Sequence, residues 1–140
     1  MAMISVVDDD LSVCRALRRL IESAGYAVET FASAREFLGS CAEGRTACLV
    51  LDIHLGEMSG FELQEQLAAE EAAIPIIFIT AYDDASIRER ITRSGVIAYL
   101  RKPFDERVLL DAIRTAVGQV DGEGDGDLSR SAGTKCGPRP

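Results

Sequence analysis

Five short apolar runs alternate along the chain with longer segments of helical periodicity. The runs have the pattern of β-strands, and they cover residues 3–8, 27–31, 48–52, 75–80 and 97–101. Three of the runs are almost continuously apolar, which is typical of strands buried on both faces of a sheet. The pattern therefore predicts a strand followed by a helix, repeated five times.

The segments between the runs carry start and stop signals of helices. Within residues 12–24 the apolar side chains fall on one helical stripe, and Gly25 can end this helix. Gly95 can end the fourth helix in the same way. The second to fifth helices each have a candidate N-terminal cap. In chain order these caps are Ser33 with Glu36, Ser59 with Glu62, Asp83 or Asp84, and Asp105.

Strands and helices in this order imply a parallel sheet with right-handed crossovers and helices on both faces. In such open sheets, ligands bind beyond the carboxyl ends of the strands, where the strand order reverses. Four of the predicted strands deliver polar residues to this edge, namely Asp8 and Asp9, Asp52, Thr80, and Lys102. The pattern therefore predicts a functional site at the carboxyl edge of the sheet.

The formal net charge of −8 argues against a nucleic-acid-binding surface, because phosphate backbones are bound by clusters of Lys and Arg. Residues 1–82 carry 13 acidic and 5 basic side chains, whereas residues 83–120 carry 6 acidic and 7 basic ones. No apolar run approaches the length that spans a membrane. We therefore expect neither direct nucleic-acid binding nor membrane insertion.

The sequence also predicts a domain organisation and a location. We expect one domain over residues 1–120, followed at 121–140 by a Gly- and Asp-rich segment that is a disordered tail or a linker remnant. The N-terminal apolar run is broken by Asp8, so it does not have the form of a signal peptide. The four cysteines stand at no metal-ligand spacing, and we expect reduced thiols in a cytoplasmic protein.

Four motifs surround the polar edge, and they are VVDDD (6–10), LVLDIHLGEMSG (49–60), FITA (78–81) and YLRKPF (99–104). Together they resemble the response-regulator receiver domain of two-component signalling, over residues 3 to about 118. The resemblance is strongest to receivers that precede helix-turn-helix output domains in longer chains. It implies an α/β fold of the flavodoxin-like (βα)5 type, a three-layer sandwich whose parallel five-stranded sheet has the order 2-1-3-4-5.

The resemblance also implies a role for each polar residue at the edge. Asp52 would be the phosphoacceptor, with Mg²⁺ as the cofactor, and Lys102 would bind the phosphoryl group. The further roles are metal binding by Asp8, Asp9, Asp52 and the backbone carbonyl of His54, and switching by the Thr80 hydroxyl and the Tyr99 ring.

The function implied is a phosphorylation-activated switch rather than an enzyme with an external substrate. The domain would take a phosphoryl group from a sensor histidine kinase or a phosphotransfer protein, and it would promote its own phosphorylation and dephosphorylation. Phosphorylation would alter the face formed by the fourth helix, the fifth strand and the fifth helix, within residues 83–120. We expect that face to form a homodimer or to bind an effector protein.

The chemistry of the residues agrees with these roles. A carboxylate with an ordinary pKa of about 3.9 is ionised at neutral pH, so Asp52 needs no general base to attack phosphorus. Electrostatic repulsion opposes this attack, because Asp52 would lie near two other carboxylates and must approach an anionic phosphoryl group. Mg²⁺ takes about six oxygen ligands and neutralises such a cluster. The crowded acids therefore predict a site for a cation.

Three further residues or bonds in these motifs lead to structural predictions. Gly56 stands where the family usually has proline, so we expect a more mobile loop after Asp52. Asp10 can either cap the first helix or lie in solvent beside the metal. By resemblance, the Lys102–Pro103 peptide bond is cis, which turns the Lys102 ammonium group into the site.

Two other functions compete with the phosphorylation switch. A phosphohydrolase of the haloacid-dehalogenase-like type also uses Asp, Mg²⁺, Thr and Lys, and DDDLS (8–12) faintly resembles its opening motif. That type needs a late acidic pair and a substrate cap, and neither is evident in this sequence. A degenerate receiver that acts only as an unphosphorylated binding module would lack at least one of the acceptor, acids, Thr or Lys, and none is missing.

Overall fold

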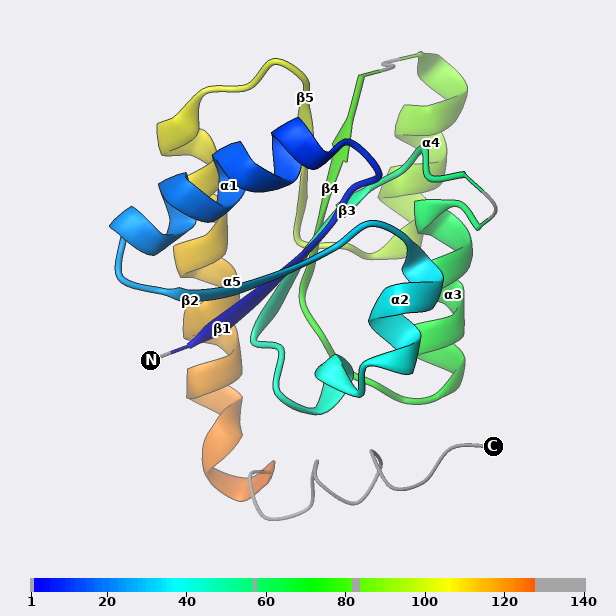
Figure 1. Cartoon of the computed structure of the whole chain (residues 1–140). Coiled ribbons are helices and arrows are strands. Elements are labelled where there is room, and N and C mark those ends of the chain that lie inside the picture. Colours follow the sequence, from blue (N-terminus) through cyan, green and yellow to red (C-terminus); the bar gives the residue numbers. More distant parts are fainter. Residues whose placement is uncertain (1, 57, 82–83, 128–140) are drawn as a thin grey trace.

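A parallel five-stranded sheet forms the centre of the molecule (Figure 1). The computed structural model describes residues 2–56, 58–81 and 84–127, with side chains as far as residue 118. The strand order is β2-β1-β3-β4-β5, and every neighbouring pair is parallel. The strands are β1 (Met3–Val7), β2 (Ala27–Phe31), β3 (Cys48–Asp52), β4 (Ile76–Thr80) and β5 (Ala98–Arg101). Both the predicted strands and their order are confirmed.

Helices cover both faces of the sheet, as the alternating pattern predicts (Figure 1). One face carries α1 (Leu11–Ser23) and α5 (Glu106–Asp127). The other face carries three helices, which are α2 (Ala34–Gly39), α3 (Gly60–Ala69) and α4 (Ala85–Ser94), and a short 3-10 turn, η1 (Ala42–Gly44), precedes β3. The result is the flavodoxin-like three-layer sandwich.

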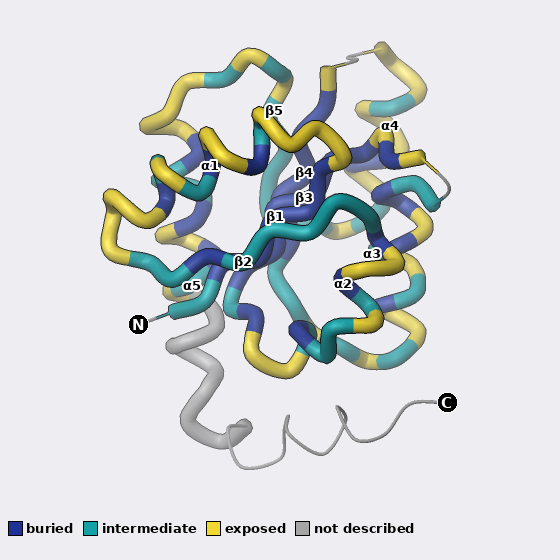
Figure 2. Tube along the Cα trace, viewed as in Figure 1, coloured by how far each residue is buried: buried dark blue, intermediate teal, exposed yellow. Residues whose placement is uncertain are grey.

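Each face of the sheet has its own apolar core, because side chains alternate along a strand. In β3 all five residues are buried, with Val50 packed on the side of α1 and α5 and with Leu49 and Leu51 on the opposite side. Figure 2 shows the buried strands at the centre and the exposed positions on the outer sides of the helices. The two cores cover both faces of the sheet, so the carboxyl ends of the strands remain as an edge that can present functional groups.

The predicted caps are present where the structure describes them. Ser59 and Glu62 form a complete capping box at the start of α3. The Ser33 side chain accepts from the Glu36 amide, but the Glu36 carboxylate accepts from Ala32 rather than from Ser33. Asp84 is the cap of α4, whereas its alternative, Asp83, lies outside the described residues. Gly25 and Gly95 end their helices with φ of 99° and 77°, a region that favours glycine.

The end of α5 differs from the sequence prediction. The helix continues to Asp127, seven residues beyond the expected domain end at 120. The chain has no proline between Pro103 and Pro138, so no residue between them lacks the amide proton that the helix uses. The remainder of the predicted tail, 128–140, lies outside the described residues. In the described part of the chain, no helix combines the length and the apolar character needed to cross a membrane.

The cysteines differ in part from the expectation. Cys14 and Cys48 are buried free thiols, and burial raises the pKa of Cys48 to about 12. Cys41 is disulfide-bonded, so the expectation of reduced thiols is wrong at this position.

Candidate functional site

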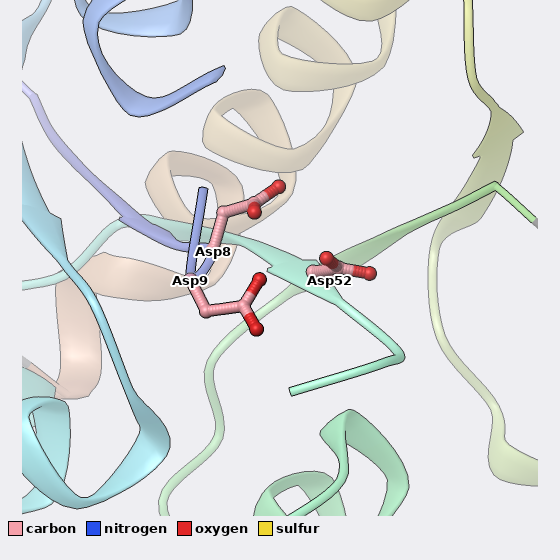
Figure 3. A group of neighbouring side chains, drawn as sticks. All are labelled: Asp8, Asp9 and Asp52. Carbon is pink, nitrogen blue, oxygen red and sulfur yellow. The ribbon is translucent and has the colours of Figure 1, made fainter. Parts of the chain in front are cut away.

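Three carboxylates gather at the carboxyl edge of the sheet (Figure 3). Asp8 and Asp9 directly follow β1, and Asp52 ends β3, which is the neighbouring strand. One carboxylate oxygen from each residue lies within 4.8 Å of the others. The structure thus brings together the three acidic side chains that the sequence predicts as metal ligands.

Burial differs sharply among the three acids. Asp8 is fully buried, Asp52 is 5% exposed, and Asp9 lies in solvent. Burial raises the pKa of Asp52, and the nearby negative charge of Asp8 raises it further. The hydrogen bond from the His54 amide and the positive charge of Lys102 lower this pKa, but the overall shift is upward. Two desolvated carboxylates side by side therefore form a site that favours a cation.

Lys102 is the cationic side chain that reaches both buried acids. Its Nζ donates to Asp8 Oδ2 at 2.9 Å and to Asp52 Oδ2 at 3.4 Å. Desolvation lowers the pKa of Lys102, but hydrogen bonds and charges of Asp8 and Asp52 outweigh it, so the pKa is raised overall. The Lys102–Pro103 bond is cis, which confirms the expectation. The ammonium group is therefore charged at neutral pH and lies between the two carboxylates.

Asp8 is also fixed from the side of α1. Its Oδ1 accepts from the Asp10 amide at 2.9 Å, and its carbonyl accepts from the Cys14 thiol at 3.2 Å. The Asp10 side chain accepts from the amides of Ser12 and Val13 at 2.8 and 3.4 Å. Asp10 is thus the cap of α1, which decides between the two roles that the sequence leaves open.

The loop after β3 contacts the Asp52 side chain through its backbone. The His54 amide donates to Asp52 Oδ1 at 3.0 Å, and its imidazole lies at the surface. This contact supports the Asp52 carboxylate, and the role of the His54 carbonyl in metal binding stays a prediction. Gly56 is exposed, and a Cβ atom there would meet no atom within 4 Å.

Thr80 lies on β4, the strand next to that of Asp52, and Tyr99 lies on β5, one strand further along the sheet. Thr80 ends β4, which pairs with β3, and it is fully buried. Tyr99 of β5 pairs with Phe78 and is half-buried against the core beneath α2, α3 and α4. The Lys102 amide donates to the Thr80 carbonyl at 2.7 Å, so these two site segments are joined. Their switch roles remain predictions.

Gly60 is a site residue that sequence reasoning missed. A Cβ atom at this first residue of α3 would lie 2.5 Å from the Asp52 carbonyl oxygen and 2.9 Å from Ile53 Cα. Its amide donates to the Ile53 carbonyl at 2.8 Å. Only glycine allows helix α3 to approach the Asp52 backbone this closely. A glycine directly after the Ser59 cap was the signal for such a contact.

Gly60→Ala should lower the free energy of unfolding by about 1–3 kcal/mol, because the added methyl group overlaps the Asp52 backbone. It should also slow phosphorylation of the chain by acetyl phosphate, since Asp52 must shift. Urea denaturation and labelling kinetics measure the two effects. Gly39→Ala is the matched control, because a Cβ atom there meets no atom within 4 Å. Equal results for both variants would contradict the positioning role of Gly60.

The donor set fits the predicted metal. Carboxylate oxygens are the ligands that Mg²⁺ prefers, and it commonly uses one or two of them with waters and phosphate oxygens. Asp8, Asp9 and Asp52 offer three carboxylates against the single charge of Lys102. This excess of negative charge agrees with a divalent cation at the site.

Comparison with known proteins shows the family. The model of the response regulator receiver domain matches residues 4–114, so the chain belongs to this family of two-component signalling domains. Nodulation protein W of Bradyrhizobium diazoefficiens is 44% identical over 115 residues, which are 82% of this chain and 51% of that protein. Response regulator protein TmoT of Ectopseudomonas mendocina is 41% identical over 116 residues, with 83% and 53% covered.

Solved structures agree with this assignment. Response regulator StyR is 44% identical, with a TM-score of 0.80 over 92% of this chain and 65% of that chain. The present chain spans about half the length of the curated relatives that it matches. The comparisons therefore identify a receiver domain, and receiver domains of response regulators are signalling switches.

Proposed function

We propose that this domain accepts a phosphoryl group on Asp52, with Mg²⁺, from the phosphohistidine of a sensor histidine kinase or phosphotransfer protein in the cytoplasm. The observation that carries the proposal is the contact of Lys102 Nζ with both Asp8 and Asp52 beside the exposed Asp9. A divalent cation and an ammonium group together can offset the charges of the carboxylates and of an incoming phosphoryl group.

In the proposed transfer, an Asp52 oxygen forms a bond to phosphorus as the phosphorus–nitrogen bond of the donor breaks. The electron pair of that bond leaves with the imidazole. The His54 amide holds Asp52 Oδ1 in place, and Lys102 turns from Asp8 toward a phosphoryl oxygen. When bound by Asp8, Asp9, Asp52 and the His54 carbonyl, Mg²⁺ would neutralise charge on the carboxylates and the phosphoryl oxygens. For dephosphorylation, a water oxygen would attack phosphorus and the phosphorus–oxygen bond to Asp52 would break, which releases inorganic phosphate and restores the Asp52 carboxylate.

Thr80 and Tyr99 are the proposed switch residues. The Thr80 hydroxyl would donate to a phosphoryl oxygen, and Tyr99 would turn into the space that Thr80 leaves. Thr80 of β4 stands opposite Arg101 of β5, and Tyr99 lies two residues before Arg101 on the same strand. Thr80 and Tyr99 are therefore diagonal neighbours on adjacent strands, which supports this pairing. A population shift of this kind needs only a few kcal/mol of differential stabilisation.

Acetyl phosphate with Mg²⁺ tests the proposed function. The intact mass should increase by one phosphoryl group, and peptide mapping should locate it on Asp52. Chelation of Mg²⁺ should prevent the increase. Absence of labelling under both conditions would favour the unphosphorylated binding module. The haloacid-dehalogenase-like alternative does not agree with the family match over residues 4–114.

The proposed output is dimerisation through α4, β5 and α5, with an effector protein as the second candidate. Charged residues of both signs support a symmetric contact, and they include Asp84, Arg88, Arg93, Asp111 and Arg114. Light scattering with beryllofluoride, a phosphoryl mimic, should show about twice the monomer mass if the domain dimerises. An unchanged mass with altered NMR signals at Thr80 and Tyr99 would indicate effector binding. No change in either would mean that the switch account is wrong.

A further inference from the structure

Helix α3 begins directly on the backbone of the phosphoacceptor. Gly60 makes the close approach to the Asp52 carbonyl, and its amide donates to Ile53. The next residue, Phe61, is only 4% exposed and packs edge-on against Phe78 of β4, with ring centroids 5.0 Å apart. The first turn of α3 is therefore fixed to both β3 and β4.

Helix α4 lies beside α3 (Figure 1). Its Arg90 side chain contacts α3. The Arg90 guanidinium carbon is 4.3 Å from the centroid of the Phe61 ring, which is a cation–π geometry. Arg90 Nη2 also lies 3.5 Å from Glu65 Oε2 on α3. These two side chains are 49% and 64% exposed, so the ion pair adds little and the ring contact is the stronger of the two.

Helix α4 buries little of its surface against the described residues. Ile91 is the buried residue of α4, and Ile87 is the partly buried residue of α4 that packs against the core. A hydrogen bond also joins α3 and α4, from Gln64 Nε2 to the Ser94 carbonyl at 3.2 Å. An element with so little buried surface moves at low cost, so a single side-chain contact can bias its position.

We propose that the contact between Arg90 and Phe61 is a latch that holds α4 against α3 and opposes the phosphorylated state. This inference rests on the proposed function. Phosphorylation draws Thr80 toward Asp52, and the cap of α4, Asp84, follows only four residues later. Helix α3 stays fixed to the Asp52 backbone, so movement of α4 separates Arg90 from Phe61. By reciprocity, weakening the latch strengthens phosphoryl binding.

The test is the affinity of the full chain for beryllofluoride with Mg²⁺, followed by NMR. Arg90→Gln should bind the mimic about fivefold more tightly than the wild type, which corresponds to about 1 kcal/mol. Arg18→Gln is the matched control, because it removes the same charge from an exposed side chain of α1, which lies on the opposite face of the sheet and outside the proposed dimer contact. Arg18 pairs with Glu22 on its own helix, and the two side chains are 43% and 49% exposed. This control should not bind more tightly than the wild type.

A double-mutant cycle separates the latch from a general loosening of the fold. Phe61→Leu should also tighten binding, and Arg90→Gln should add nothing in that background, because its ring partner is gone. The latch is overturned if Arg90→Gln tightens binding no more than Arg18→Gln, or if the effects of Arg90→Gln and Phe61→Leu are additive. If beryllofluoride shifts no signal near Asp52 in the wild type, the proposed function fails and the latch fails with it.

Discussion

Asp52→Asn should reduce phosphorylation by acetyl phosphate by at least about a thousandfold, because it removes the nucleophile of the transfer. The amide has nearly the shape of the carboxylate, so the fold should persist. It lacks the negative charge that would attack phosphorus and would contribute to the proposed metal site. Removal of Mg²⁺ by chelation should have a similar effect on the wild type. Labelling kinetics by intact mass spectrometry measure both.

Asp10→Asn is the matched control for this substitution. It removes one carboxylate two residues from Asp8, but Asn caps a helix as well as Asp does, and the amide that supports Asp8 is retained. Its phosphorylation rate should stay close to that of the wild type. If Asp52→Asn were labelled as rapidly as Asp10→Asn, Asp52 would not be the acceptor.

The fold was largely predictable because each level of the sequence favours the same structure. The continuous apolar run of β3 needs two covered faces, and the structure provides them with separate cores on each side. Turn and cap residues such as Ser59 and Gly95 then set where the helices begin and end. The end of α5 was not predictable, because Gly and Asp only weaken a helix and no proline stops it before residue 138.

The composition of the site was predictable from strand ends, but its contacts were not. The parallel arrangement of the strands places Asp8 and Asp52 at one edge of the sheet, and this placement does not depend on side-chain conformation. The bridge from Lys102 to both acids depends on the path of the chain after β5, which periodicity does not determine. The close packing of Gly60 on Asp52 depends on the approach of α3 to β3, which is a tertiary distance. The roles of Thr80 and Tyr99 stay predictions because they concern a second state.

Lys102→Met should lower the free energy of unfolding in metal-free buffer by about 1–3 kcal/mol. The Asp8 side chain is fully buried and accepts from the Lys102 ammonium group at 2.9 Å, so the variant leaves a buried carboxylate without its cation. Loss of one partner from a buried ion pair typically costs about 3–5 kcal/mol. The expected loss is smaller than this typical cost for two reasons. The Lys102 side chain is 22% exposed, and the Asp10 amide still donates to the Asp8 carboxylate. Urea denaturation in the presence of a chelator measures the loss.

Mg²⁺ should stabilise Lys102→Met more than it stabilises the wild type, because Lys102 and the metal compete for the same Asp8 and Asp52 oxygens. Removal of one nearby positive charge should raise the affinity for Mg²⁺, and binding to the folded state alone then adds stability by mass action. The stability difference between variant and wild type should therefore shrink as Mg²⁺ is added. Arg114→Met is the control, since Arg114 is 75% exposed and pairs with Asp111 on its own helix; it should change stability by less than about 0.5 kcal/mol with or without the metal. Equal stabilisation of Lys102→Met and the wild type by Mg²⁺ would contradict a metal site at these carboxylates.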